Sequence, residues 1–266
     1  MACSGAVVLL ALLPACSSQV RTSGTPLLRI LATDSSFVVP AVVPGGLTEV
    51  RLINHGREIH EGLLAHYLTA DANHVRYVDS VRAGVELPAF AEDVGGPGLA
   101  SPGDSTTAWL DLRPGRYGVY CWNEDHVERG IAQDFEVTAS SRAATPPQAD
   151  LHVGMFEYGY SIRGSWSAGR HTILAENGGT EPHEFDFYRL AEGRTIGDFI
   201  AWVGRERHAP HAATTVAGTG DFVPGRKVWI RVTLAPGHYV AFCQVPARSD
   251  QRAHYKHGMI REFVVP

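Results

Sequence analysis

Residues able to bind a metal ion occur twice along the chain, in the same order and at almost the same spacing. In each half a histidine is followed 61 or 60 residues later by a cysteine and then by a second histidine; the residues are His60, Cys121 and His126, then His183, Cys243, His254 and the further Met259. A thiolate and two imidazoles, with a weak axial thioether, suit copper both as Cu(I) and as Cu(II). The two sets predict two copper sites that can exchange single electrons.

The repeat extends well beyond these residues. The 28 residues that end at each cysteine, 94–121 and 216–243, align without a gap and are identical at ten positions. An Asn-x-Gly segment beginning at Asn54 or Asn177 also precedes each first histidine. A repeat of roughly 120 residues is too long for a solenoid and suits a duplicated domain.

Short segments of alternating apolar and polar residues, separated by glycine and proline, predict β-strands. They lie at 28–32, 48–53, 108–112, 228–232 and 262–265. Each half also has one segment of helical spacing, at 71–82 and at 196–205. The predicted fold class is all-β, with two Greek-key β-sandwich domains that each carry one short helical insertion.

The domain boundaries follow from composition. Residues 139–149 lack apolar periodicity and contain Pro146-Pro147, which favours an extended linker. We therefore expect a first domain at 27–138 and a second at 150–266. With 266 residues, each domain is large enough to bury its own core.

The N-terminus predicts export. Residues 6–13 form an apolar run too short to span a bilayer, and it ends in Leu13-Pro14-Ala15-Cys16. This segment resembles the lipobox of bacterial lipoproteins, although no Lys or Arg precedes the apolar run. The resemblance implies a signal peptide at 1–16, a lipid on Cys16 and a tether at 17–26. The mature protein would face the periplasm or the cell exterior, with the lipid as its only membrane attachment.

The arrangement of ligand types resembles the cupredoxin family, the plastocyanin- and azurin-like blue-copper proteins. In that family the first histidine follows a strand and an Asn-x-Gly-type loop, and the cysteine, second histidine and methionine lie on the loop that joins the last two strands. Cys121-x4-His126 has an azurin-like spacing, and His254-x4-Met259 has the plastocyanin spacing. The resemblance implies one type 1 copper ion in each domain.

Two departures from the family pattern distinguish the halves. Ten residues separate Cys243 from His254, where small cupredoxins have two to four. In the first half Ile131 stands where a methionine is expected, so the second half has the fuller ligand set. His257 is an alternative to His254 as ligand, and Met259 is alternatively a core methionine.

Several function classes are disfavoured by the sequence. The net charge is −5 and the sequence has no long basic run, so it does not predict a positively charged surface for binding nucleic acid. Multicopper oxidases use His-x-His pairs, and copper nitrite reductases use a histidine directly before the cysteine. The sequence contains no His-x-His pair, and Tyr120 and Phe242 precede the cysteines. We therefore expect no self-contained oxidase or nitrite reductase.

The sequence thus predicts a single-electron carrier of the cell envelope that serves a redox partner protein. Assembly into an oligomer is compatible with this prediction. Two alternatives remain open at this point. One is a copper-binding or storage protein without a role in electron transfer, and the other is a copper-free cupredoxin-like interaction module.

Overall fold

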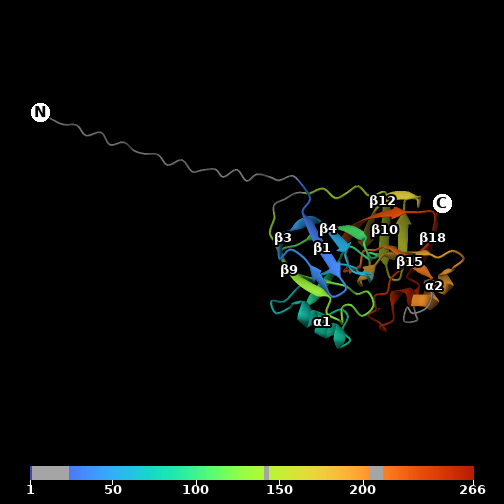
Figure 1. Cartoon of the computed structure of the whole chain (residues 1–266), viewed down its shortest axis with the longest axis horizontal. Coiled ribbons are helices and arrows are strands. Elements are labelled where there is room, and N and C mark those ends of the chain that lie inside the picture. The colour runs from blue at the N-terminus through green and yellow to red at the C-terminus, as the bar shows by residue number, and fades with distance from the viewer. Residues whose placement is uncertain (2–23, 141–143, 204–211) are drawn as a thin grey trace.

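The computed structural model describes residue 1 and residues 24–140, 144–203 and 212–266, with β-strands as the main regular structure (Figure 1). The first half contains β1 (Leu27–Thr33), β2 (Ser36–Val38), β3 (Val42–Pro44), β4 (Gly46–Asn54), β5 (Leu63–Tyr67), β6 (Ala91–Gly95), β7 (Ser105–Leu112), β8 (Gly115–Tyr120) and β9 (Ala132–Thr138). The second half contains β10 (Leu151–Phe156), β11 (Gly159–Arg163), β12 (Gly169–Asn177), β13 (His183–Glu184), β14 (Asp186–Leu190), β15 (Ala213–Ala217), β16 (Asp221–Phe222), β17 (Lys227–Leu234), β18 (Gly237–Phe242) and β19 (Ile260–Val265).

Some predicted features lie outside the described residues. These are the signal peptide after residue 1, including Cys16, most of the tether 17–26, positions 141–143 of the linker and positions 204–205 of the second helix. Lipidation and the domain boundaries therefore stay predictions.

Each half also contains one short helix, α1 (His74–Arg82) or α2 (Ile196–Val203). The first helix begins at His74 rather than at residue 71 because the side chain of Asn73 accepts a hydrogen bond from the Arg76 amide at 3.0 Å. In α2, Phe199 and Trp202 are the buried residues. The predicted fold class is confirmed: the fold is all-β, with two Greek-key sandwiches and one helical insertion in each.

Equivalent strands build the two sandwiches. In the first half β1 pairs in parallel with β4, and β4 pairs antiparallel with β7; β10, β12 and β17 repeat this arrangement in the second half. The opposite sheets have the corresponding orders β6-β5-β8-β9 and β15-β14-β18-β19. In β4 and β12 the side chains alternate towards the core and end on the buried Asn54 and Asn177.

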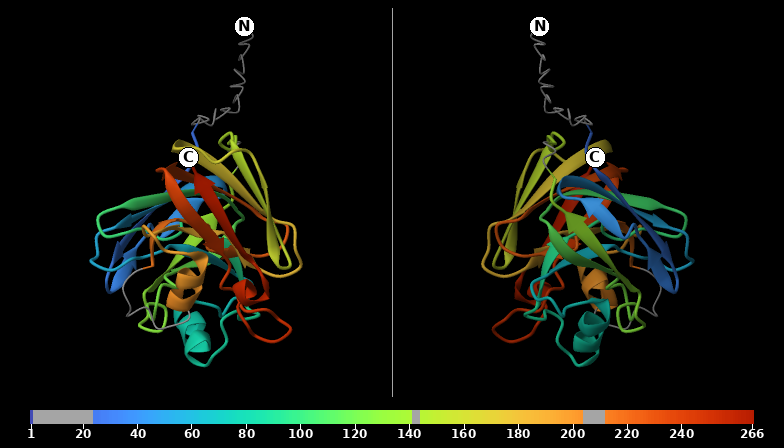
Figure 2. Two further views of the ribbon diagram at one scale, coloured as in Figure 1. Left: turned by 90° about the vertical axis from the view of Figure 1, so that its right-hand side faces the viewer. Right: turned by 90° about the vertical axis from the view of Figure 1, so that its left-hand side faces the viewer.

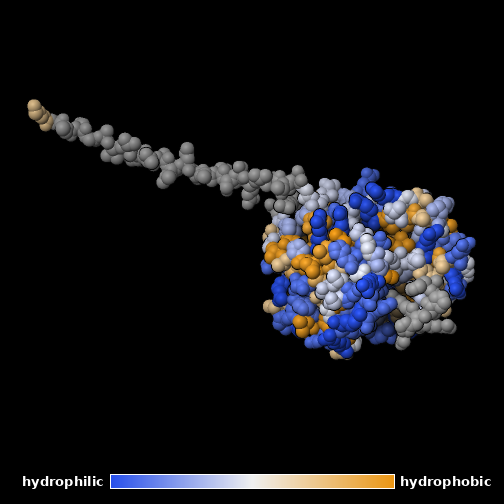
Figure 3. All heavy atoms as spheres, in the orientation of Figure 1, coloured by the Kyte–Doolittle hydropathy of each residue, from blue (hydrophilic) through white to orange (hydrophobic). Residues whose placement is uncertain are grey.

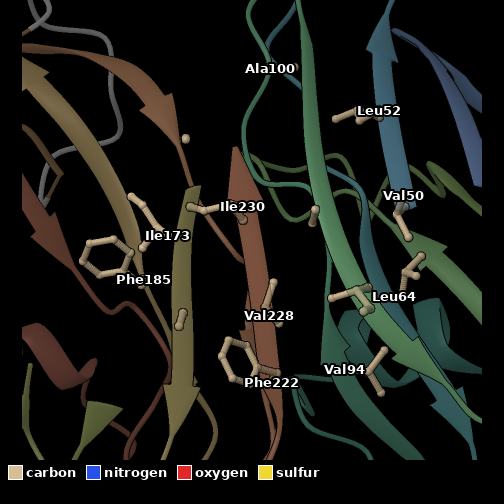
Figure 4. Packing of buried hydrophobic residues seen from close by; sticks show 14 of the residues in the cluster. Val50, Leu52, Leu64, Val94, Ala100, Ile173, Phe185, Phe222, Val228 and Ile230 are labelled. Carbon is tan, nitrogen blue, oxygen red and sulfur yellow. The ribbon is translucent and has the colours of Figure 1, made fainter. Parts of the chain in front are cut away.

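Strand pairing joins the two sandwiches edge to edge. β7 and β17 pair antiparallel with Ala108 opposite Ile230, which produces one eight-stranded sheet. Because Ala108 and Ile230 occupy equivalent places in the repeat, the halves meet about an approximate two-fold axis. On the other face, Val94 of β6 pairs with Phe222 of β16. Figure 4 shows these two residues among the buried side chains of a cluster that contains residues of both halves.

Repeated glycines permit close backbone contact at this junction. A Cβ atom on Gly98 would lie 2.6 Å from backbone atoms of Gly218, and the Gly98 amide donates to the Gly218 carbonyl at 3.1 Å. A Cβ atom on Gly96 would lie 2.0 Å from the carbonyl oxygen of Gly62. Gly96 and Gly98 recur in the second half as Gly218 and Gly220, where a Cβ atom would instead meet the side chains of Asp186 and Leu63.

The two ends of the molecule carry different features. Figure 2 shows the chain entering β1 near the C-terminus at one end, while α1 and the loop after β18 lie at the opposite end. Among the described residues, no helix has the length and apolar composition needed to cross a membrane. The face drawn in Figure 3 mixes polar and apolar side chains.

Candidate metal centres

The first candidate centre gathers His60, which follows β4, with Cys121 and His126 from the connection between β8 and β9. All three side chains are fully buried. The Sγ atom of Cys121 lies 3.6 Å from Nδ1 of His60 and 3.2 Å from Nδ1 of His126. The two imidazole centroids are 4.6 Å apart. One sulfur and two ring nitrogens therefore meet at one place in the core.

The second candidate centre has the same composition. His183 opens β13, Cys243 follows β18, and His254 opens the short 3-10 helix η1 (His254–His257). Nδ1 of His254 lies 3.0 Å from Nδ1 of His183 and 3.4 Å from Sγ of Cys243. His257, the alternative ligand, points elsewhere and contacts Asp250 at 3.0 Å. The structure brings His254, and not His257, to the cysteine.

Met259 and Ile131 hold equivalent positions beside the two centres. The Met259 amide donates to the carbonyl of the second histidine of its centre at 3.0 Å, and its carbonyl accepts from the cysteine amide at 3.1 Å. Ile131 makes the same two bonds at 3.0 and 3.3 Å. Both side chains are buried in the cluster that contains the two cysteines. One centre therefore has a thioether residue where the other has a hydrocarbon.

The outer nitrogens of the histidines in the first centre lie against carboxylates. Nε2 of His60 is 3.3 Å from Oδ1 of Asp34, and Nε2 of His126 is 2.9 Å from Oε2 of Glu58. The Glu58 contact is close without the alignment of a hydrogen bond, and the same oxygen accepts from Arg129 at 2.6 Å. The carboxylates lie on the side of the rings away from the sulfur.

The second centre repeats this feature. Nε2 of His183 lies 3.2 Å from Oε1 of Glu157, and Nε2 of His254 lies 3.0 Å from Oε2 of Glu181. A carboxylate on the outer nitrogen fixes the tautomer and the ring orientation, so that the Nδ1 lone pair is directed at the metal position. We call Asp34, Glu58, Glu157 and Glu181 the clamp carboxylates.

Sequence reasoning missed the clamp carboxylates, although two of them carried a signal. Glu58 and Glu181 each stand two residues before the first histidine of their half. Asp34 and Glu157 share a position 26 residues before it, but their different residue types hid the repeat.

The Asn-x-Gly segments shape the loop that leads to each first histidine. Asn54 donates from Nδ2 to the Glu58 carbonyl at 2.8 Å, and its Oδ1 accepts from the Gly56 amide at 2.8 Å. Asn177 makes the equivalent bonds at 2.9 Å each. A Cβ atom on Gly56 would lie 2.2 Å from Oδ1 of Asp34. The glycine is therefore required by the clamp carboxylate that packs against it.

The glutamate after each first histidine links the two ligand loops. Oε1 of Glu61 accepts from the Trp122 amide at 2.8 Å, and the Glu61 amide donates to Sγ of Cys121 at 3.4 Å. Glu184 accepts from the Gln244 amide in the same way. These bonds hold the residue after each cysteine in place, so the two glutamates have a positioning role.

Burial sets the protonation states of the ligand groups. It raises the pKa of the Cys121 and Cys243 thiols above the usual range, so that each sulfur keeps its proton until a metal displaces it. Burial also lowers the pKa of the second histidine in each centre and of His183, which keeps these rings neutral at pH 7. Copper loading would therefore release protons.

The residue before each cysteine faces an aromatic cluster instead of a polar site. The Tyr120 hydroxyl lies 2.5 Å from that of Tyr67, and its ring stacks on Tyr77 at 4.0 Å. Phe242 packs against Phe199 with ring centroids 5.0 Å apart.

Comparison with known proteins gave only distant likenesses. No family model and no curated protein sequence matches the chain. A dithionite-reduced auracyanin from the photosynthetic bacterium Roseiflexus castenholzii is 18% identical, with 44% of this chain and 98% of that chain covered and a TM-score of 0.32. A multicopper oxidase is 16% identical, with 90% and 88% covered and a TM-score of 0.25. Copper nitrite reductase from Nitrosomonas europaea is 14% identical, with 91% and 94% covered and a TM-score of 0.25.

Likenesses of this size say nothing about activity, so the case for a metal rests on the two centres themselves. In each, a buried thiol and two imidazoles offer ligand atoms that lie within 4.8 Å of one another. A soft sulfur donor with two imidazoles is a donor set that copper favours. Two Greek-key sandwiches that each hold such a group support copper binding.

Proposed function

We propose that this protein is a single-electron carrier of the cell envelope with one type 1 copper ion in each half. Copper would be held by His60, Cys121 and His126 in the first half, and by His183, Cys243, His254 and Met259 in the second. The observation that carries the proposal is the buried convergence of one sulfur and two Nδ1 atoms in both halves. Bound copper would supply one-electron exchange between its two oxidation states.

The protein would contribute rigidity. The clamp carboxylates fix the imidazoles, and the backbone amide of Glu61 donates to Sγ of Cys121. Glu157 stays ionised: burial works against this, but the amides of Thr180 and Glu181 lower its pKa to about 2. Because the donor atoms are already gathered, little rearrangement would accompany a change in charge.

We propose a carrier rather than an enzyme because of the residues that precede the two cysteines. Tyr120 and Phe242 pack in aromatic clusters at the positions where copper nitrite reductases place a histidine ligand. A substrate-reducing copper would lack protein ligands there.

Titration of the full chain with Cu(II) tests the proposal. We expect an intense thiolate-to-copper absorption band towards the red end of the spectrum, saturating at two copper ions per chain. Electron spin resonance should detect both ions, and both signals should vanish on reduction and return on oxidation. A chain that takes up copper but stays colourless and reduced would support a storage protein instead. Absence of copper uptake would leave only a copper-free interaction module.

Exchange of the residues at the axial position should move the two reduction potentials in opposite directions. Oxidised copper benefits more than reduced copper from a fourth donor, so the first centre should have the higher potential. Met259→Leu is expected to raise the potential of the second centre towards that of the first, and Ile131→Met is expected to lower that of the first. Redox titration of each blue band measures both. Unchanged potentials in both variants would show that neither side chain reaches its copper.

A lipid on Cys16 would orient the protein usefully. The chain enters β1 at the end of the molecule opposite to α1 and the loop after β18, which contains Cys243 and His254 (Figure 2). An anchored chain would thus present this loop away from the membrane, towards a redox partner protein. If cells are lysed and separated into membrane and soluble fractions, recovery of the protein in the soluble fraction would argue against the anchor.

A further inference from the structure

Two aspartates from different halves meet at the junction of the sandwiches. The carboxyl groups of Asp93 on β6 and Asp221 on β16 lie at one cavity, close enough for a hydrogen bond between them. The neighbouring residues Val94 and Phe222 pair the two strands, and the Val223 amide donates to the Asp93 carbonyl at 3.1 Å. Asp93 is only 5% exposed. A carboxyl pair therefore lies at the point where β6 and β16 hold the halves together.

The surroundings of this pair supply no positive charge. Both aspartates line a cavity of about 350 Å³ whose lining, within the described residues, contains no Lys, Arg or His. The same lining includes the carboxyl groups of Glu61, Glu86, Glu124, Glu128, Glu184 and Asp186.

Groups on the adjoining elements do not neutralise the pair either. The Tyr77 hydroxyl of α1 donates to Oδ1 of Asp93 at 3.1 Å, and burial beside Asp93 raises the pKa of this phenol, which stays neutral. Glu92 on β6 faces away towards Arg226 at 3.9 Å. In the part of the chain that the structure describes, the pair therefore has a neutral donor but no counter-ion.

A hydrogen bond between two carboxyl groups requires a proton. An ionised carboxylate only accepts, so one partner must be protonated. Without that proton, two negative charges, one buried on Asp93 and one half-buried on Asp221, would repel each other. We propose that Asp93 and Asp221 form a proton-operated latch: one shared proton holds β6 to β16, and loss of that proton drives the two strands apart.

The latch is specific to one side of the duplicated fold. The positions equivalent to Asp93 and Asp221 in the other half are Thr215 and Leu99, so the repeat itself does not need carboxyl groups here. A neutral contact, between the hydroxyls of Ser101 and Thr215 at 3.5 Å, lies on that side. The two-fold arrangement is thus broken by a pair that responds to protons.

The latch also adjoins the second candidate centre. β16 is the only strand in the described residues that pairs with β13, and β13 begins with His183. Opening of β6 from β16 would therefore loosen the strand that carries this histidine. Protons would act on the second centre through strand pairing, without touching its ligands.

The direction of the pH effect follows from the proton count. Burial raises the pKa of Asp93 far above its usual value and that of Asp221 to about 6, and burial of nearby Asp186 raises its pKa to about 7. Unfolded aspartates release their protons near pH 4, at about 3.9. Between roughly pH 4 and 7 these aspartates therefore hold more protons in the folded state, and their contribution to stability falls as the pH rises. The lowered pKa values of the buried His126, His183 and His254 act in the opposite sense but are common to the wild type and the variants.

Calorimetry of the copper-free full chain tests the latch independently of the proposed function. Relative to an Asp221→Asn variant, the unfolding temperature of the wild type is expected to fall by roughly 5 °C between pH 5 and pH 8. Asp221→Asn should lose the pair's share of the pH dependence and keep that of Asp186, because the amide donates to Asp93 without a shared proton. The exposed Asp104→Asn is the matched control and should keep the wild-type slope.

Infrared spectroscopy of the wild type covers the case in which the variant does not fold. The carbonyl band of a protonated, buried carboxylic acid should be present at pH 6 and absent at high pH. A folded Asp221→Asn variant with the wild-type pH slope would overturn the latch. Absence of the protonated-acid band at pH 6 would overturn it as well.

Discussion

Replacement of Cys121 by serine is expected to remove one of two blue chromophores and to leave the other unchanged, and Cys243→Ser to do the converse. The colour of a type 1 site arises from the copper–thiolate bond, and a serine hydroxyl is not ionised at neutral pH, so the loss at the altered centre should be complete. Serine fits the site because the Glu61 amide, which donates to Sγ of Cys121 at 3.4 Å, can donate to a hydroxyl instead. The absorbance of each copper-loaded variant should therefore fall by about one half.

A matched pair of histidines provides the control. His254 faces Cys243, whereas His257, three residues further along the chain, contacts Asp250. His254→Ala should remove the second chromophore, and His257→Ala should retain it. If both bands vanish in a single cysteine variant that keeps its unfolding temperature, the two centres are not independent. If neither band is lost, the cysteines are not ligands.

The strands and the ligand sets could be predicted because they depend on local patterns. Alternation of buried and exposed side chains in β4 and β17 is visible in the sequence itself. The ligand sets were visible because the chain carries them twice. The ten residues between Cys243 and His254 did not disturb the second set, since the Pro246–Ala253 bridge closes this loop and the His254 amide donates to the Val245 carbonyl at 2.9 Å.

The contacts between distant segments could not be predicted in the same way. The pairing of Ala108 with Ile230 depends on how two complete sandwiches fit together. The sequence of β7 or β17 alone does not determine which strand pairs with its outer edge. Asp34 likewise reads as an ordinary turn residue after β1. Its role becomes visible only when the fold brings it to within 3.3 Å of Nε2 of His60.

Replacement of the clamp carboxylates is expected to cause a large loss of copper affinity. Removal of a carboxylate behind a metal-bound histidine typically costs about 10- to 100-fold in metal affinity. Asp34→Ala is expected to weaken copper binding in the first centre by this factor, and Glu157→Ala in the second. Competition with a chelator, followed through each blue band, measures the two affinities separately. The exposed Glu136→Ala lies on β9, outside both ligand loops, so it should change neither affinity.

The physical reason is that each of these two carboxylates organises a loop as well as a ring. Oδ1 of Asp34 accepts from the amides of Arg57 and Glu58 at 2.7 and 3.0 Å as well as contacting His60. Asp34→Asn keeps an acceptor oxygen but loses the charge, so an affinity close to wild type would assign the effect to loop geometry. Gly56→Ala tests the same geometry without altering any charge, because its Cβ atom would lie 2.2 Å from Oδ1 of Asp34. Wild-type affinity in both Asp34→Ala and Gly56→Ala would show that the first copper does not depend on this clamp.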